Sequence, residues 1–251
     1  MTAGSTFNFT TNKFVLFHRY LLYTNYYKSK YSGGPAMKIL GILGSPRLNG
    51  RCAKLLNSAL VGAQSTGAEV ETFKLIRRNV KYCLGCGNCY TKNPELTIGN
   101  CPIKDETQSM LKEYLTYDGY FYASPAYDMF TTALMKTFLE RKIAFTYKSP
   151  DTTSHVTIPG PRPGITQNFK KKASFIVTAN VTDELEEVMG EPCYEAFEAH
   201  LLFEEIDTYE KLFCGGVERI TPEAFQKKRD SAYQMGINIV QEIKKARSCS
   251  K

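Results

Sequence analysis

The feature that most constrains the fold is an alternation of short apolar strands with helical segments that starts at Met37. The first strand, residues 38–43, is apolar along nearly its whole length, as expected when both faces of a parallel strand are buried. Later runs of strand type lie at residues 69–75, 119–123, 173–178 and 209–214. Helical periodicity separates these runs. The pattern therefore predicts an α/β fold, a doubly wound five-stranded parallel sheet with helices on both faces.

Two segments depart from this alternation. Residues 1–36 end in Ser-Gly-Gly-Pro-Ala, which is typical of a flexible joint. We therefore predict a flexible N-terminal extension over residues 1–36 and one domain over residues 37–251. Prolines and glycines between residues 148 and 172 argue against regular structure there. They predict an insertion that acts as a lid, an interface arm or a mobile loop.

The charge gives little support to a nucleic-acid-binding role. The formal net charge is +7, but the extension carries four basic residues and no acidic residue, which leaves +3 on residues 37–251. The apolar runs of the extension are interrupted at His18 and Arg19 and are too short for a membrane span. Half of the eight cysteines lie in one loop, which indicates metal or redox use in a reducing compartment. We therefore expect a cytoplasmic protein.

The cysteine loop follows the second predicted strand. It reads Cys83-Leu84-Gly85-Cys86-Gly87-Asn88-Cys89, and a fourth cysteine, Cys101, precedes a proline. Two-residue gaps let one loop turn several thiolates toward a common centre, as in proteins that hold an iron–sulfur cluster. Free thiols and a structural zinc ion are the alternatives, although zinc sites more often use two separated Cys-x-x-Cys pairs.

The loop after the first strand has the composition of a phosphate site. It reads Gly44-Ser45-Pro46-Arg47-Leu48-Asn49-Gly50-Arg51-Cys52 and leads into a helix. Backbone N–H groups, the positive end of the helix dipole, a hydroxyl and a guanidinium can all reach one anionic group there. The pattern is neither a Walker loop nor the Gly-x-Gly-x-x-Gly dinucleotide motif. The alternative is an ordinary turn between a strand and a helix.

A third motif makes the resemblance to a known family specific. Residues 124–127 read Ser-Pro-Ala-Tyr, and residues 134–141 contain Leu-x-Lys-x-Phe-x-x-Arg. Together with Gly-Ser-Pro-Arg-x-x-Gly at residues 44–50, these motifs resemble the NADPH-dependent FMN reductase family of flavodoxin-like proteins. The clustered cysteines make the iron-sulfur flavoproteins the branch of closest resemblance. The likeness spans residues 37 to 246, apart from much of the insertion.

The resemblance implies a flavodoxin-like strand order, 2-1-3-4-5, and two sets of FMN-binding residues. The FMN phosphate would be held by Ser45, Arg47, Asn49, Gly50, Arg51 and Cys52. The ribityl chain and the isoalloxazine ring would lie against Pro125, Ala126, Tyr127, Asp128, Met129 and Phe130. Residues 178–180 would face the same crevice. Cys52 departs from the usual Ser or Thr of the family, so we expect a weakened phosphate site.

The same resemblance implies a [4Fe-4S] cluster with Cys83, Cys86, Cys89 and Cys101 as metal ligands. Because the second strand neighbours the first, the cysteine loop is expected beside the phosphate loop, where a cluster could exchange electrons with flavin. One departure stands out. Eleven residues separate Cys89 from Cys101, whereas the branch usually keeps its fourth cysteine within a few residues of the third.

The predicted function is that of an FMN-dependent oxidoreductase. Electrons would pass from NAD(P)H or a ferredoxin-like donor to a small-molecule or protein redox partner, with the cluster as a second redox centre. The alternatives are a cluster-free NAD(P)H-dependent flavin or quinone reductase and a non-catalytic flavodoxin-like electron carrier. The resemblance further implies a homo-oligomer with flavin near the subunit interface.

Overall fold

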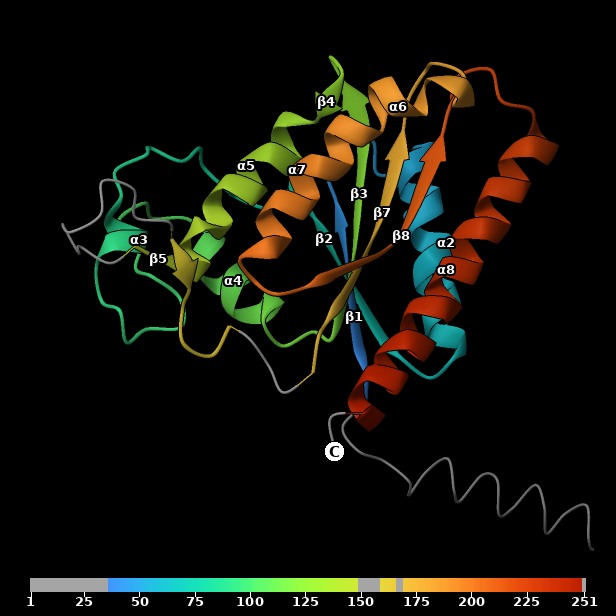
Figure 1. Ribbon diagram of the computed structural model, residues 1–251. Helices are drawn as coiled ribbons and strands as arrows, with labels where there is room; N and C mark the ends of the chain where they lie inside the picture. The colour runs from blue at the N-terminus through green and yellow to red at the C-terminus, as the bar shows by residue number, and fades with distance from the viewer. Residues whose placement is uncertain (1–35, 149–158, 166–168, 250–251) are drawn as a thin grey trace, which may run out of the picture. The chain divides into compact units, whose positions relative to one another are not determined.

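The computed structural model describes residues 36–148, 159–165 and 169–249, and its main sheet is parallel (Figure 1). The order of the long strands is β2-β1-β3-β7-β8. Their bounds are β1 Lys38–Leu43, β2 Glu69–Lys74, β3 Gly119–Tyr127, β7 Lys172–Thr178 and β8 Asp207–Cys214. All four neighbouring pairs are parallel. This order is compatible with the predicted order 2-1-3-4-5, since β7 and β8 are the fourth and fifth long strands, and the α/β flavodoxin-like architecture is confirmed.

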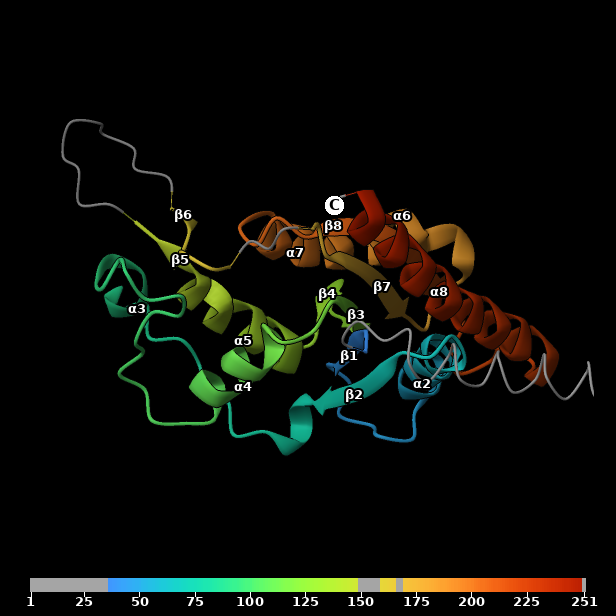
Figure 2. The same cartoon turned by 90° about the horizontal axis from the view of Figure 1, so that it is seen from below.

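Helices cover both faces of this sheet (Figures 1 and 2). One face carries α2 (Arg51–Ser65) and α8 (Pro222–Cys249). The other carries α4 (Thr107–Tyr114), α5 (Ala133–Arg141) and α7 (Glu191–Leu202). Short helical turns complete the described chain: η1 (Leu75–Arg77), α3 (Asn88–Thr91), η2 (Lys142–Phe145), η3 (Asp183–Leu185) and α6 (Glu186–Met189).

The apolar first strand is buried on both faces, as its sequence predicts. Ile39 and Leu43 pack in the core beneath α2 and α8, whereas Leu40 and Ile42 belong to the core on the other face. Successive side chains of a strand point to opposite sides, so a continuous apolar run supplies two separate cores at once. This double burial holds the loop after β1 at a rigid edge.

Three short strands and the longer β3 were not anticipated. β3 continues to Tyr127 because residues 123–125 pair with β7, and β4 (Phe130–Thr131) folds back antiparallel on its end. The expectation that the insertion lacks regular structure is wrong at one place: β6 (Gly160–Pro161) pairs with β5 (Thr146–Tyr147). Backbone hydrogen bonds to β5 outweigh the composition of these two residues.

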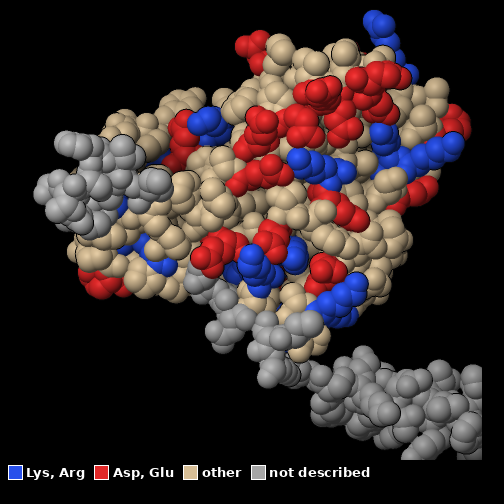
Figure 3. Space-filling view, viewed as in Figure 1, with Lys and Arg blue, Asp and Glu red and all other residues tan. Residues whose placement is uncertain are grey.

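Other parts of the expected organisation lie outside the described residues. Residues 1–35, 149–158 and 166–168 are among them, so the extension and the full course of the insertion stay predictions. Across the described ranges, every helix is too short or too polar to cross a membrane. Figure 3 shows acidic side chains gathered over α6 and α7, so the net positive charge is not concentrated on this face.

Helices α2 and α8 touch backbone to backbone through two glycines. A Cβ on Gly62 would lie 1.9 Å from the carbonyl oxygen of Tyr233, and one on Gly236 would lie 1.9 Å from that of Ala59. Neither oxygen can move without displacing a helix. The close packing of the two helices therefore requires a residue without a Cβ, that is glycine, at both positions.

Replacing Gly236 by Ala should destabilise the domain, although alanine has the higher helix propensity. We expect the free energy of unfolding to fall by about 1–3 kcal/mol, because the added methyl group overpacks a backbone contact. Urea unfolding followed by circular dichroism measures this change. Gln241→Ala, at an exposed position of α8, is the control and should leave stability nearly unchanged. A G236A variant as stable as the parent chain would contradict the packing argument.

Candidate functional site

The loop after β1 presents the start of α2 without a side-chain cap. Gly50 is the N-cap residue, and no side chain accepts from the first amides of the helix. Ser45 is buried, and its Oγ accepts a hydrogen bond from the Arg47 backbone N–H at 3.1 Å. Uncapped amides and the positive end of the helix dipole form an environment that favours an anion. The loop thus leaves the first amides of α2 without a side-chain partner, and the phosphate site stays a prediction.

The loops after β1 and β3 are tied to each other at the start of α5. The Gly44 backbone N–H donates to the carbonyl oxygen of Ala123 at 2.8 Å. Thr132 caps α5 by accepting from the Met135 N–H at 3.2 Å, and its hydroxyl donates to the Gly44 carbonyl at 2.7 Å. One threonine therefore fixes the helix and the phosphate loop in a single arrangement.

A cavity of about 240 Å³ opens between these loops and the ends of β7 and β8. Eight of the twelve predicted FMN-binding residues line it: Ser45, Arg47, Gly50, Arg51, Cys52, Pro125, Ala126 and Tyr127. Asn49 instead lines a neighbouring groove along α2. Of the other three, Asp128 and Met129 form the turn between β3 and β4 and Phe130 begins β4; none of them lines the cavity.

That turn exposes apolar side chains beside the cavity. Tyr127 is 46% exposed, Met129 52% and Phe130 37%. Asp128 and Met129 have positive φ angles of 50° and 61°, values that few residues other than glycine adopt. A tight, strained turn thus holds three large apolar groups in solvent at the mouth of the cavity.

The cavity also contains residues that the sequence did not single out. Val217 and Glu218, after β8, line it together with residues 178–180 after β7. Asn180 Nδ2 donates to Glu218 Oε2 at 2.8 Å, and Arg51 Nη1 donates to the Val217 carbonyl at 2.7 Å. The loop after β8 carries no motif, so only its place at the carboxyl edge of the sheet could have indicated it.

Cys52 stands where the resembling family has a hydroxyl residue, and its thiol is neutral. Burial raises the pKa of Cys52 to about 12, and a hydrogen bond with Thr178 offsets this only in part. A neutral thiol adds no negative charge to the loop. The Cys52 backbone remains at the start of α2, so the position keeps the N–H group that an anion needs.

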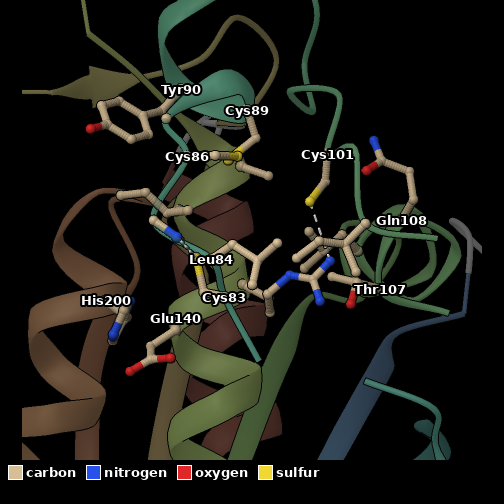
Figure 4. A pocket seen from close by; sticks show the side chains of 17 residues that line it. Cys83, Leu84, Cys86, Cys89, Tyr90, Cys101, Thr107, Gln108, Glu140 and His200 are labelled. Carbon is tan, nitrogen blue, oxygen red and sulfur yellow. Dashed lines mark hydrogen bonds between the residues drawn. The ribbon is translucent and has the colours of Figure 1, made fainter. Parts of the chain in front are cut away.

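The four predicted metal ligands line one separate cavity of about 450 Å³. Figure 4 shows Cys83, Cys86 and Cys89 on one stretch of chain and Cys101 entering from another. Burial raises the pKa of Cys89 to about 11, and the negative charges of Cys101, Cys83 and Cys86 add to this effect. The charges of the other three thiolates thus all act on Cys89.

A buried arginine joins the two stretches of chain that carry these cysteines. Arg141, in the last turn of α5, donates through Nη2 to the sulfur of Cys101 at 3.3 Å. Its Nη1 donates to the Lys81 carbonyl at 2.7 Å and to Asp105 Oδ2 at 2.6 Å. The side chains of Arg141 and Asp105 are 2% and 1% exposed. The ion pair thus anchors both ends of the cysteine loop to α5.

The four cysteines that line this cavity are a donor set that both iron–sulfur clusters and zinc ions use. A tetrahedral zinc ion draws its sulfur ligands close together, because each Zn–S bond is only about 2.3 Å long. A cluster places an inorganic core between its thiolates and so allows them a wider spacing. Within the described ranges, no three His, Cys, Asp or Glu side chains are arranged to hold one metal ion.

The expectation that the cysteine loop lies beside the phosphate loop is wrong. The two cavities share no lining residue. Thr132 at the start of α5 belongs to the phosphate-loop side, whereas Arg141 at its end contacts the cysteine cavity. Nine helical residues span about 13 Å. The chain after β2 runs along η1 to the far end of α5, and for this reason the two sites are a helix length apart.

A buried polar network adjoins the cysteine cavity and was not predicted. Lys142 Nζ lies 2.7 Å from Glu204 Oε1 and donates to Tyr122 Oη at 2.7 Å. His200 lines the cysteine cavity, and burial lowers its pKa to about 3, with the positive charges of Lys142 and Lys136 acting in the same direction. His200 is therefore uncharged at neutral pH. The sequence places His200 on a helix but does not indicate that it lines the cysteine cavity.

Comparison with solved structures agrees with the architecture. The chain aligns with the NAD(P)H:quinone oxidoreductase from Methanothermobacter marburgensis at a TM-score of 0.61 and 15% identity, over 82% of this chain and all of that one. A flavone reductase aligns at a TM-score of 0.57 and 22% identity, over 83% and 63% of the two chains. These likenesses show the fold alone, which is α/β and flavodoxin-like.

Sequence comparison identifies the family that the chain resembles. The pattern of the family described as NADPH-dependent FMN reductase matches residues 37–153 of this chain. An iron-sulfur flavoprotein of Archaeoglobus fulgidus is 36% identical over 112 residues, which are 45% of this chain and 48% of the relative. The chain thus spans about half the length of the curated relatives it matches. The predicted resemblance is confirmed, and the matched segment contains the cysteine loop.

The Arg141–Asp105 pair makes stability depend on pH in a defined direction. Burial by itself raises the pKa of Asp105, but hydrogen bonds from Arg141 and from two backbone amides lower it from 3.8 to about 2. The stabilisation is fully present above about pH 4 and is lost as the pH falls toward 2. We expect Asp105→Asn to lower the free energy of unfolding at pH 7 by about 3–5 kcal/mol.

Urea unfolding between pH 7 and pH 2.5 tests this expectation. The D105N variant should lose less stability on acidification than the parent chain, because the titrating group is gone. Asp230→Asn, at an exposed position of α8, serves as the control. Equal acid sensitivity of D105N and the parent chain would show that the pair does not control the pH dependence.

Proposed function

We propose that the protein is an FMN-dependent oxidoreductase with a second redox centre at the cysteine cavity. The observation that carries the proposal is the uncapped start of α2, which faces a cavity bounded by the loops after β1 and β3. The match of residues 37–153 to the FMN reductase family supports flavin as the occupant. FMN would supply hydride and single-electron chemistry, while the chain binds and orients it.

In this proposal the phosphate lies at the start of α2, held by backbone N–H groups of residues 50–52 and by the Arg47 side chain. The cavity of about 240 Å³ is smaller than the usual range for organic ligands, about 300–1,000 Å³. A flavin seated there by its phosphate would therefore extend past the mouth. The exposed Tyr127, Met129 and Phe130 offer an apolar surface for the flat ring.

The same exposed turn supports a homo-oligomer. Large apolar groups at the mouth of a ligand cavity are typical of surfaces that a partner covers. We propose that a second copy of the chain covers the ring-binding turn. We further propose that the electron donor is NAD(P)H or a ferredoxin-like protein and that the acceptor is a small molecule or a protein. These proposals rest on the family resemblance. The cysteine usage supports a cytoplasmic location.

For the second centre we propose a [4Fe-4S] cluster bound by the four cysteines. Two supporting observations are their shared cavity and the N–H group that Arg141 donates to the sulfur of Cys101. The names of the iron-sulfur flavoproteins that resemble this chain support the same occupant. The cluster would supply one-electron transfer, and the chain would set its charge environment.

A cluster-free flavin or quinone reductase is the second candidate. The observation in its favour is Cys89, whose thiol is 7% exposed and whose pKa is raised to about 11. Such a thiol stays protonated at neutral pH and forms a thiolate only at a cost. Iron and sulfide analysis of anaerobically purified protein separates the two candidates, because both would bind FMN.

Arg47→Ala should weaken FMN retention, because it removes a side-chain cation from the lining of the proposed phosphate site. A charge-assisted hydrogen bond contributes about 1.5–3 kcal/mol, so we expect the dissociation constant of FMN to rise at least about tenfold. Fluorescence titration of the apoprotein with FMN measures the change. Arg77→Ala, at an exposed position of η1, is the control and should bind FMN as the parent chain does. Unchanged affinity in R47A would defeat the assignment of Arg47.

Cys86→Ala should abolish cluster binding without loss of flavin. Cys86 is exposed, so its replacement is not expected to disturb the core. After anaerobic reconstitution with iron and sulfide, we expect iron per chain to fall several-fold and broad visible absorption beyond the flavin bands to disappear. Cys193→Ala, a buried thiol on α7 outside the cavity, should retain both. Equal iron content in C86A and the parent chain would reject the cluster.

A further inference from the structure

The eleven residues between Cys89 and Cys101 fold around one arginine from the insertion. Arg162 is almost completely buried, and within the described part of the chain its side chain donates hydrogen bonds to backbone carbonyl groups alone. The acceptors are Thr146 at 3.0 Å from Nε, Asn93 and Leu96 at 2.5 and 3.0 Å from Nη1, and Cys89 and Lys92 at 2.9 and 2.7 Å from Nη2. Four of these five acceptors belong to the loop from Cys89 to Leu96.

Arginine suits this position because its planar fork carries five N–H donors and no acceptor. A loop without strands leaves its inward carbonyl groups without partners, and buried carbonyl groups need donors. Arg162 supplies them from the centre of the loop. Its guanidinium also lies over the ring of Tyr147, 5.5 Å from the centroid. The loop is therefore closed around the side chain of a residue about 70 positions later in the sequence.

Gly99 completes this arrangement just before Cys101. A Cβ at Gly99 would lie 1.7 Å from the Cys89 carbonyl oxygen and 2.8 Å from Arg162 Nη2. The Gly99 N–H donates to the Ala144 carbonyl at 2.8 Å. The backbone two residues before Cys101 thus lies directly against Cys89 and Arg162. The return of the chain to the cysteine cavity depends on that close approach.

We propose that Arg162 is the positioning residue of the cysteine cavity: it closes the long loop so that Cys101 joins Cys83, Cys86 and Cys89 as the fourth ligand. In relatives of the resembling branch a short spacing would do this without help, whereas this chain uses the insertion. The inference deepens the proposed function and, for the cluster, rests on it.

The first test measures cluster loading of the full-length, FMN-loaded chain after anaerobic reconstitution with ferrous iron and sulfide. Arg162→Ala should lose at least about tenfold in iron and sulfide retention, as is typical when a group that orients metal ligands is removed. Gly99→Ala should show the same loss, although it removes no hydrogen-bond donor. FMN per chain should not change in either variant, and Arg77→Ala should retain full loading. Full loading of R162A would overturn the proposal.

The second test needs no cluster. In the iron-free, FMN-loaded chain, the rate of iodoacetamide labelling is measured for each cysteine by mass spectrometry. Cys89 is buried and should label slowly in the parent chain and at least about tenfold faster in R162A and G99A. Cys193, buried on α7, is the internal reference and should not change. Unchanged labelling of Cys89 in both variants would overturn the positioning role.

The two tests separate failure of this inference from failure of the proposed function. If the parent chain binds no iron, the cluster is rejected, and the labelling rate of Cys89 alone decides the role of Arg162. If R162A accelerates labelling of Cys193 as well, the domain has unfolded. In that case Arg162→Lys, which keeps the charge but cannot reach all five carbonyl groups, replaces R162A in the labelling test. Faster labelling of Cys89 with unchanged labelling of Cys193 supports the positioning role, and unchanged labelling of Cys89 overturns it.

Discussion

Buried backbone carbonyl groups need hydrogen-bond donors, and this requirement determines how the long loop between η1 and α4 is held. The loop from Val80 to Glu106 contains only the single turn of α3, so few of its carbonyl groups are satisfied by regular structure. Two buried arginines from other segments bind this loop. Arg141 donates to the Lys81 carbonyl at one end and to the Asp105 carboxylate at the other, and Arg162 donates to carbonyl groups in the middle. Without them the four cysteines would belong to a loop with no fixed shape. The cysteine cavity is thus a consequence of two guanidinium groups.

Helix α5 connects the two candidate sites, because each of its ends contacts one of them. Its first turn is fixed to the phosphate loop by Thr132, and its last turn is fixed to the cysteine loop by Arg141. A helix is stiff over so short a length, so the spacing of the two sites is set by its residue count. Lys142, the centre of the buried polar network, directly follows the last residue of α5. Any electron passing between the sites within one chain would travel alongside this helix.

Much of this arrangement could be predicted from local sequence. The apolar run at residues 38–43 predicted a strand buried on both faces, and the loop at residues 44–52 predicted an anion site, because both depend on neighbouring residues alone. Other features could not be predicted. Val217 and Glu218 enter the cavity only because β8 pairs with β7, and Arg162 reaches the cysteine loop only because β6 pairs with β5. Such contacts are set by pairing between distant segments, which no local pattern encodes.

The sequence by itself determined the strand and helix order, the phosphate loop and the four thiols, since each rests on residue type and short spacing. The tertiary structure alone decided that the cysteine loop lies a helix length from the phosphate loop, because the course of the chain after β2 depends on Arg141 and Asp105. It also decided how an eleven-residue gap can still bring Cys101 to the cavity. There the physical reason is one buried guanidinium that binds five carbonyl groups at once.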